Sequence, residues 1–82
     1  MSSTRRGERF GPSLALGAVI RERRKELGLS QEALAGEAAL DRTYVGGLER
    51  GERNPTLRVL WRLSAALQLS PGDLMKRTDA RL

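Results

Sequence analysis

Residues 30–51 read SQEALAGEAALDRTYVGGLERG, and this stretch decides the fold. Ser30 and Asp41 each stand just before a short helical pattern, where their side chains can accept hydrogen bonds from free backbone N–H groups. We therefore expect one helix over 31–38 and another over 42–50, which the glycine that follows would end. The two expected helices are so close in sequence that a tight turn must join them.

This pair of helices also carries apolar residues where the two would touch. The residues are Leu34, Ala35, Ala38, Leu40, Val45 and Leu48. Ala35 is informative because two helices that cross steeply over a tight turn leave room only for a small side chain. Two short helices with this turn and this packing pattern form a helix-turn-helix motif.

Three further helices are expected around the motif. Apolar residues recur at helical spacing over 14–27, a segment that Gly28 would end. The same spacing predicts a fourth helix over 57–67 and a fifth over 71–77. The capping residues expected for these three helices are Ser13, Thr56 and Ser70. No segment alternates in the manner of a strand, so the sequence predicts an all-α fold of five helices.

The 82 residues are enough for one small domain. Residues 1–13 contain three arginines, two glycines and a proline, which is typical of a flexible basic arm. The helix-turn-helix domain is expected over 14–77, and 78–82 is expected to be a C-terminal tail. No segment has the pattern of a signal peptide or a membrane span, so we expect a cytoplasmic protein that contacts no membrane.

The composition excludes several kinds of function. The chain has no Cys and no His, which rules out thiolate metal sites and the commonest general base, and we expect neither metal nor cofactor. It carries 15 basic residues, thirteen of them Arg, against 10 acidic residues, for a net charge of +5. This excess suits a polyanionic partner, because a guanidinium group can bind a phosphate or a guanine edge through two hydrogen bonds. The codons of a GC-rich genome would also enrich Arg.

Three stretches resemble the Xre/Cro family of phage and bacterial repressors: GLSQEALA at 28–35, LDRTYVGGLERG at 40–51 and NPTL at 54–57. The run 41–47 is especially similar to the controller proteins of restriction–modification systems. The resemblance implies a lambda-repressor-like fold of five helices and a sequence-specific regulator of transcription. Ala39 departs from the family, which usually has Gly in the turn, and a positive φ at Ala39 would cost about 1 kcal/mol.

A helical wheel places Val45, Leu48 and Glu49 on the inward side of the 42–50 helix. The residues then expected to contact or approach DNA bases are Arg42, Thr43, Tyr44, Gly46 and Gly47. Arg can read guanine and Thr a thymine methyl, and the resemblance implies base contacts for both residues. Tyr44 could instead bind a phosphate. The two glycines either bring the helix backbone close to DNA or are merely tolerated by neighbouring packing.

Phosphate contacts are expected from Gln31, Arg50, Arg53 and Asn54. Gln31 begins a helix whose positive end favours an anion, and the resemblance gives Gln this role. The other three residues surround the loop after the 42–50 helix, and in the family that loop lies along the sugar-phosphate backbone. Gln31 and Arg53 could also be merely solvated. For the basic group Arg21, Arg23 and Lys25 on the first helix, a solvated face is the favoured interpretation.

Two charged residues, Arg24 and Glu49, fall on apolar faces of their helices. Burying either charge alone would be costly, so we expect a hydrogen-bonded pair that ties the first helix to the third, as the resemblance also implies. A dimer interface is expected from the last two helices, where apolar residues exceed the needs of one small core. Its residues are Leu57, Trp61, Leu69, Leu74 and Met75.

The leading hypothesis is a transcription regulator that binds double-stranded DNA as a homodimer, with the third helix in the major groove of a two-fold related operator. RNA polymerase is a further candidate partner. One alternative is an antitoxin-type protein whose main partner is another protein, and a second is a nucleic-acid binder without sequence preference. An enzyme is not expected, because the sequence shows no acid–base constellation.

Overall fold

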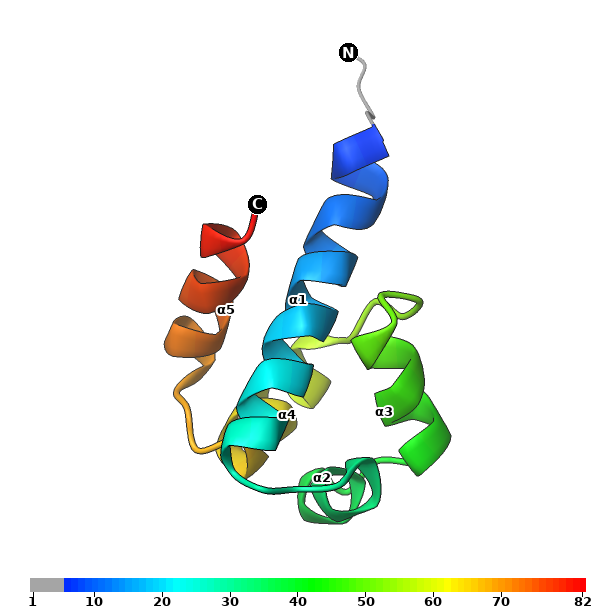
Figure 1. Ribbon diagram of the computed structural model, residues 1–82, viewed down its shortest axis with the longest axis vertical. Coiled ribbons are helices and arrows are strands. Elements are labelled where there is room, and N and C mark those ends of the chain that lie inside the picture. Colours follow the sequence, from blue (N-terminus) through cyan, green and yellow to red (C-terminus); the bar gives the residue numbers. More distant parts are fainter. Residues whose placement is uncertain (1–5) are drawn as a thin grey trace.

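The computed structural model describes residues 6–82, and within them it contains five helices and no strand (Figure 1). The helices are α1 (Arg6–Glu26), α2 (Gln31–Ala38), α3 (Arg42–Glu49), α4 (Leu57–Ala66) and α5 (Pro71–Ala80). The all-α fold expected from the sequence is therefore confirmed over these residues. None of the described helices combines the length and the apolar character that crossing a bilayer would require.

Four helices begin where the sequence predicts, because a capping side chain binds a free N–H group in the first turn. The caps are Ser30, Asp41, Thr56 and Ser70, with acceptor distances of 2.9, 3.1, 3.2 and 3.0 Å in that order. Gly28 and Gly51 follow α1 and α3 with φ of 73° and 78°. These positive angles favour glycine, so both glycines end their helices as expected.

The outer ends of the first and last helices differ from the prediction. α1 begins at Arg6 and includes Pro12 and Ser13, so the helix covers much of the segment expected to be an arm, while residues 1–5 lie outside the described part. Ser13 is not a cap, because it lies inside α1, and its Oγ instead donates a hydrogen bond to Asn54 Oδ1 at 3.0 Å. α5 runs on through the expected tail to Ala80. Its buried Thr78 satisfies its hydroxyl within the helix by donating to a backbone carbonyl at 2.8 Å.

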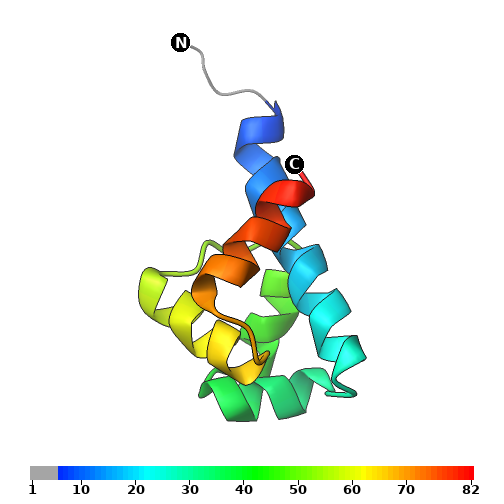
Figure 2. The same cartoon turned by 90° about the vertical axis from the view of Figure 1, so that its left-hand side faces the viewer.

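The helices pack around one apolar core, with α1 against α3 and α5, α2 against α3 and α4, and α4 against α5 (Figures 1 and 2). The core residues are Leu16, Val19, Ile20, Leu34, Ala35, Ala38, Val45, Leu48, Leu63, Ala66, Leu67 and Leu74. Gly17 sets the distance between α1 and α3, because a Cβ atom there would lie only 2.6 Å from the carbonyl oxygen of Glu49. The absence of a side chain therefore lets α1 support the end of α3 directly.

The turn between α2 and α3 has the backbone that the sequence led us to expect. Ala39 adopts φ 57° and ψ 46°, the left-handed conformation in which glycine is usual. The N–H of Leu40 reaches back to the carbonyl of Ala35 at 2.8 Å and so closes the end of α2. Ala39 carries the strain that its Cβ causes, and Leu40 packs partly into the core just beyond it.

Candidate nucleic-acid interface

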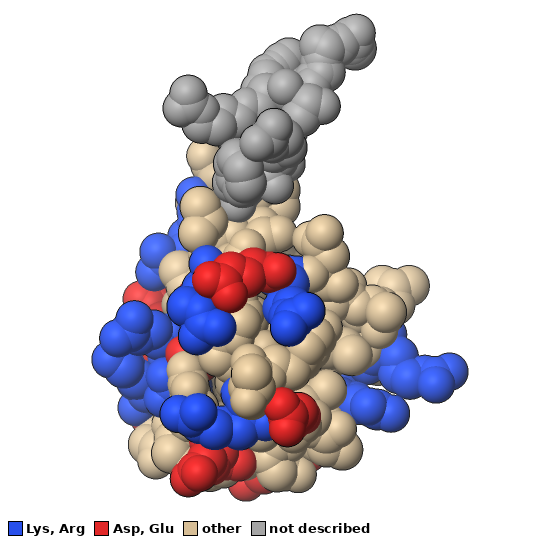
Figure 3. Space-filling model, turned by 90° about the vertical axis from the view of Figure 1, so that its right-hand side faces the viewer, with Lys and Arg blue, Asp and Glu red and all other residues tan. Residues whose placement is uncertain are grey.

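The first turn of α3 presents two polar side chains to solvent. Arg42 and Thr43 are both exposed, while Val45 and Leu48 on the opposite side of the helix are fully buried. Tyr44 lies between these two faces and packs partly against the core. Figure 3 views the side on which α3 lies in Figure 1, where basic side chains are spread over the surface with acidic ones among them.

The two glycines of α3 are buried, because longer side chains lie over them. A Cβ atom on Gly47 would lie 3.1 Å from Cγ of Arg53, whose guanidinium carbon is 5.8 Å from the centre of the Tyr44 ring. A Cβ atom on Gly46 would lie 3.2 Å from a guanidinium nitrogen of Arg50. Because the glycines have no side chains, the side chains of Arg50 and Arg53 can pack directly against the backbone of α3.

The structure brings Arg24 and Glu49 together in a two-pronged ion pair. Arg24 Nε donates to Glu49 Oε2 at 2.6 Å and NH2 donates to Oε1 at 2.9 Å. A third donor of Arg24 reaches the carbonyl of Leu29 at 3.0 Å. Arg24 is 9% exposed and the Glu49 side chain is 4% exposed, so the pair lies inside the molecule and joins α1 to α3.

Gln31 extends this pair toward the surface, a link that was not expected from the sequence. Its Nε2 donates to Glu49 Oε1 at 3.0 Å, so one carboxylate holds side chains from α1 and α2. Burial raises the pKa of Glu49, but the hydrogen bonds from Arg24 and Gln31, together with the positive charges of Arg24 and Arg21, outweigh burial and hold this pKa below its ordinary value. The hydrogen bond to Glu49 raises the pKa of Arg24 against the opposing effect of burial. Both groups are therefore charged at neutral pH.

The remaining phosphate candidates lie near the end of α3. Arg50 is exposed and pairs with Glu52 at 3.2 Å. Arg53 rests on Gly47, and Asn54 is held by α1 through its bond from Ser13. At the other end of α3, a polar hollow lies between the starts of α2 and α3, with Gln31 and Arg42 both on its walls; it is lined by Arg24, Ser30, Gln31, Glu32 and Arg42.

The basic group on α1 is only partly a solvated face. Arg21 and Lys25 are exposed as expected. Arg23 is half-buried, and its Nε donates to the carbonyl of Leu67 at 2.9 Å while NH1 pairs with Glu26 at 3.0 Å. Arg23 therefore caps the end of α4, because its long side chain reaches from α1 to a free carbonyl in the last turn of α4.

The residues expected at a dimer interface do not all lie on the surface. Leu57, Trp61 and Met75 are 71%, 59% and 39% exposed, and they line an apolar hollow between α4 and α5. Leu69 is half-buried and packs against the core. The prediction for Leu74 is wrong, because this side chain is fully buried in the core and has no surface to offer a partner.

A short α2 and α3 joined by a tight turn, with a cationic side chain at the exposed start of α3, define a DNA-binding helix-turn-helix protein. A family model described as helix-turn-helix matches residues 20–74, and the chain belongs to this family, which is of the Xre type. The sequence is 47% identical over 62 residues to the control protein C.SmaI of Serratia marcescens, covering 76% of this chain and 74% of that protein.

Solved structures give the same result. The restriction–modification controller protein C.AhdI from Aeromonas hydrophila is 45% identical with a TM-score of 0.77, covering 79% of this chain and 98% of that one. The controller protein C.Esp1396I, solved as a tetramer with its natural 35 base-pair operator, is 33% identical with a TM-score of 0.77, covering 85% and 92%. The protein is thus a DNA-binding transcriptional regulator of the controller-protein type, and its relatives are regulators rather than enzymes.

Proposed function

We propose that this regulator binds a two-fold related operator as a homodimer, with one α3 in the major groove of each half-site. The observation that carries the proposal is the exposed first turn of α3, where Arg42 and Thr43 stand clear of the core. Two copies related by a two-fold axis would place their α3 helices about one turn of DNA apart. C.Esp1396I, which was solved as a tetramer with its operator, supports by similarity the part of the proposal that several copies of the chain bind one operator.

In this proposal, Arg42 hydrogen-bonds a guanine edge and Thr43 contacts a thymine methyl or an acceptor. Tyr44 lies beside them at the edge of the same face. Gly46 and Gly47 leave the middle of α3 without side chains, so that a base edge or the side chain of an arginine can lie close to the helix backbone. Each good base contact contributes about 1–3 kcal/mol of discrimination.

The phosphate contacts of the proposal flank α3 on both sides. Gln31 stands at the start of α2, where the helix end favours an anion, and Arg50, Arg53 and Asn54 follow α3 in the chain. Such contacts fix the position of the protein on DNA without reading sequence. Their number sets how steeply the affinity falls as salt is added.

A second copy of the chain is the proposed occupant of the apolar face formed by Leu57, Trp61 and Met75. A small DNA-binding module makes few base contacts, so pairing supplies the affinity that one copy lacks. An antitoxin-type protein would use the same face to bind a different protein. Sedimentation of the purified protein distinguishes a homodimer from an antitoxin-type protein. A purified chain that sediments as a dimer, and as a monomer once Trp61 is replaced by Glu, uses this face to bind its own copy.

Contacts with RNA polymerase and a cytoplasmic location are proposed together with this function, because a transcription regulator acts where the DNA and the polymerase are.

Selection of duplexes from a random pool tests the proposal. We expect a two-fold symmetric site, and Arg42→Ala is expected to lose preference at one position of each half-site. The matched control is Arg77→Ala, which removes an exposed arginine from α5 and should lower the affinity slightly without changing the preferred sequence. If no common site emerges and affinity depends on salt alone, the protein binds without sequence preference and the proposal fails.

A further inference from the structure

One face of α1 supports the end of α3 and the loop that follows it. Gly17 lies against the last carbonyls of α3, Leu14 lies against Gly51, and Ser13 binds Asn54. Ser13, Leu14 and Gly17 are spaced one and three residues apart, which places them on adjoining parts of a helix surface. The loop that bears two of the proposed phosphate contacts is therefore built onto α1.

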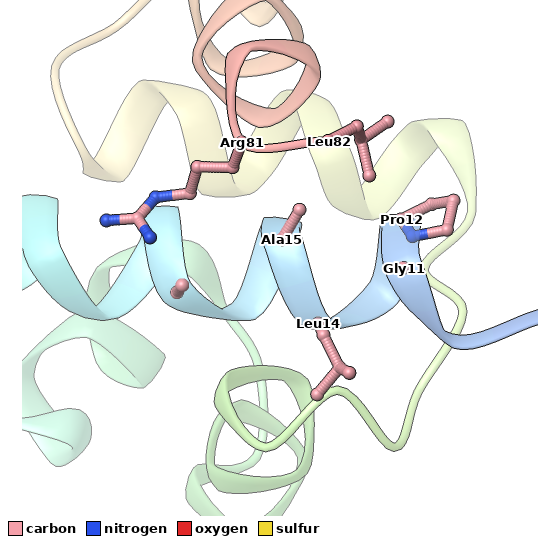
Figure 4. A pocket seen from close by; sticks show the side chains of 7 residues that line it. Gly11, Pro12, Leu14, Ala15, Arg81 and Leu82 are labelled. Atoms are coloured by element: carbon pink, nitrogen blue, oxygen red, sulfur yellow. The ribbon is translucent and has the colours of Figure 1, made fainter. Parts of the chain in front are cut away.

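Leu14 determines how closely this loop approaches α1. A Cβ atom on Gly51 would lie 3.1 Å from Cα of Leu14, so glycine allows close backbone approach here in addition to its φ of 78°. Figure 4 shows Leu14 on the side of α1 that faces α3 and this loop. Arg81 and Leu82 lie on the opposite side of α1, where they line a groove between the end of α5 and α1 to which Leu14 also contributes.

Ser13 fixes the direction of the Asn54 amide. Its hydroxyl donates to Oδ1 at 3.0 Å and so occupies the acceptor end of that amide. The two N–H donors of Nδ2 are at the other end, and donors are what a phosphate oxygen requires. If the amide were turned around, it would offer an oxygen to an anion and repel it.

We infer that Ser13 is a positioning residue for DNA binding, acting through Asn54 to aim the amide N–H group at a backbone phosphate. The inference rests on the proposed function, because it deepens the role of the loop after α3. It also gives the long α1 a part in DNA binding, because the residue responsible lies in a helix with no place in the helix-turn-helix motif itself.

A double-mutant cycle on the selected operator duplex tests the inference. The affinity of the full chain would be measured by fluorescence anisotropy for wild type, Ser13→Ala, Asn54→Ala and the double variant. Loss of one hydrogen bond at this exposed site should weaken binding by roughly two- to tenfold in Ser13→Ala. The double variant should bind as Asn54→Ala does, since Ser13 has nothing left to orient, and Ser13→Thr should keep wild-type affinity because it keeps the hydroxyl.

Arg42→Ala provides the matched control, because Ser13 does not act through Arg42 and the two effects should therefore multiply. Melting temperatures of all variants separate a loss of fold from a loss of positioning. Wild-type affinity for Ser13→Ala, or multiplying effects of Ser13→Ala and Asn54→Ala, would overturn the inference. Those results would leave the proposed function standing, whereas failure of wild type to select an operator would remove the proposed function itself.

Discussion

Replacing Glu49 by Ala should destabilise the protein strongly, because it leaves the charge of Arg24 buried without its partner. The change removes the hydrogen bonds at 2.6 and 2.9 Å and leaves a guanidinium group in a residue that is 9% exposed. Breaking a buried pair from one side costs about 3–5 kcal/mol. We expect the lower value, about 3 kcal/mol, since Arg24 keeps its bond to Leu29 and lines a hollow through which water can reach it.

Urea unfolding followed by circular dichroism at pH 7 measures this effect. For a chain of this size the slope is about 1 kcal/mol per molar urea, so the midpoint should fall by about 3 M. The matched control is Glu52→Ala, whose carboxylate pairs with Arg50 where both side chains are 59% exposed, and which should cost under about 1 kcal/mol. Both variants must be compared at one protein concentration, because pairing of copies adds to stability. A loss for Glu49→Ala no larger than that for Glu52→Ala would refute the reasoning.

The structure also determines how stability depends on pH and how the protein responds to side chains added at three glycines. The pKa of Glu49 is lower in the folded than in the unfolded protein, so its contribution to folding stability is complete above the unfolded value of about 4.3 and is lost as the pH falls through the folded value. The urea midpoints at pH 6 and pH 3 should therefore differ less in Glu49→Gln than in wild type. Gly17→Ala should destabilise by about 1–3 kcal/mol because its Cβ meets backbone, whereas Gly36→Ala, with nothing within 4 Å, should gain up to about 1 kcal/mol; equal melting temperatures for the two would contradict the close packing of α1 on α3. Gly47→Leu should keep the fold, because only the flexible side chain of Arg53 must move to make room. The variant should bind the operator more weakly in a gel-shift assay. Tight binding would show that the middle of α3 does not need to lack side chains.

The helix starts could be predicted because their causes are local. Ser30, Asp41, Thr56 and Ser70 each bind an N–H group two or three residues further on, so a short window of sequence contains both partners. The start of α1 could not be predicted in this way. Gly and Pro near residue 12 argue against a helix, and the contacts of α1 with the loop after α3 involve residues about forty positions away.

Burial on α5 shows a second limit of sequence reasoning. Leu74 and Met75 are adjacent and both apolar, yet Leu74 is fully buried and Met75 is 39% exposed, because neighbours on a helix point about 100° apart. The inward stripe continues from Leu74 to Thr78, whose polar side chain conceals the pattern. Thr78 can be buried because it bonds the carbonyl of Leu74 within the same helix.

The link between Gln31 and Glu49 gives a reason for a charged pair at a position where apolar residues would also fill the space. Well-packed apolar residues often replace a buried ion pair with no loss of stability, so stability alone does not explain Arg24 and Glu49. Glu49 Oε1 also accepts from Gln31, the residue proposed to meet a phosphate. The double replacement Arg24→Met with Glu49→Leu should therefore recover most of the stability that Glu49→Ala loses, yet still bind the operator more weakly than wild type. Operator affinity equal to wild type in this variant would show that Gln31 needs no such support.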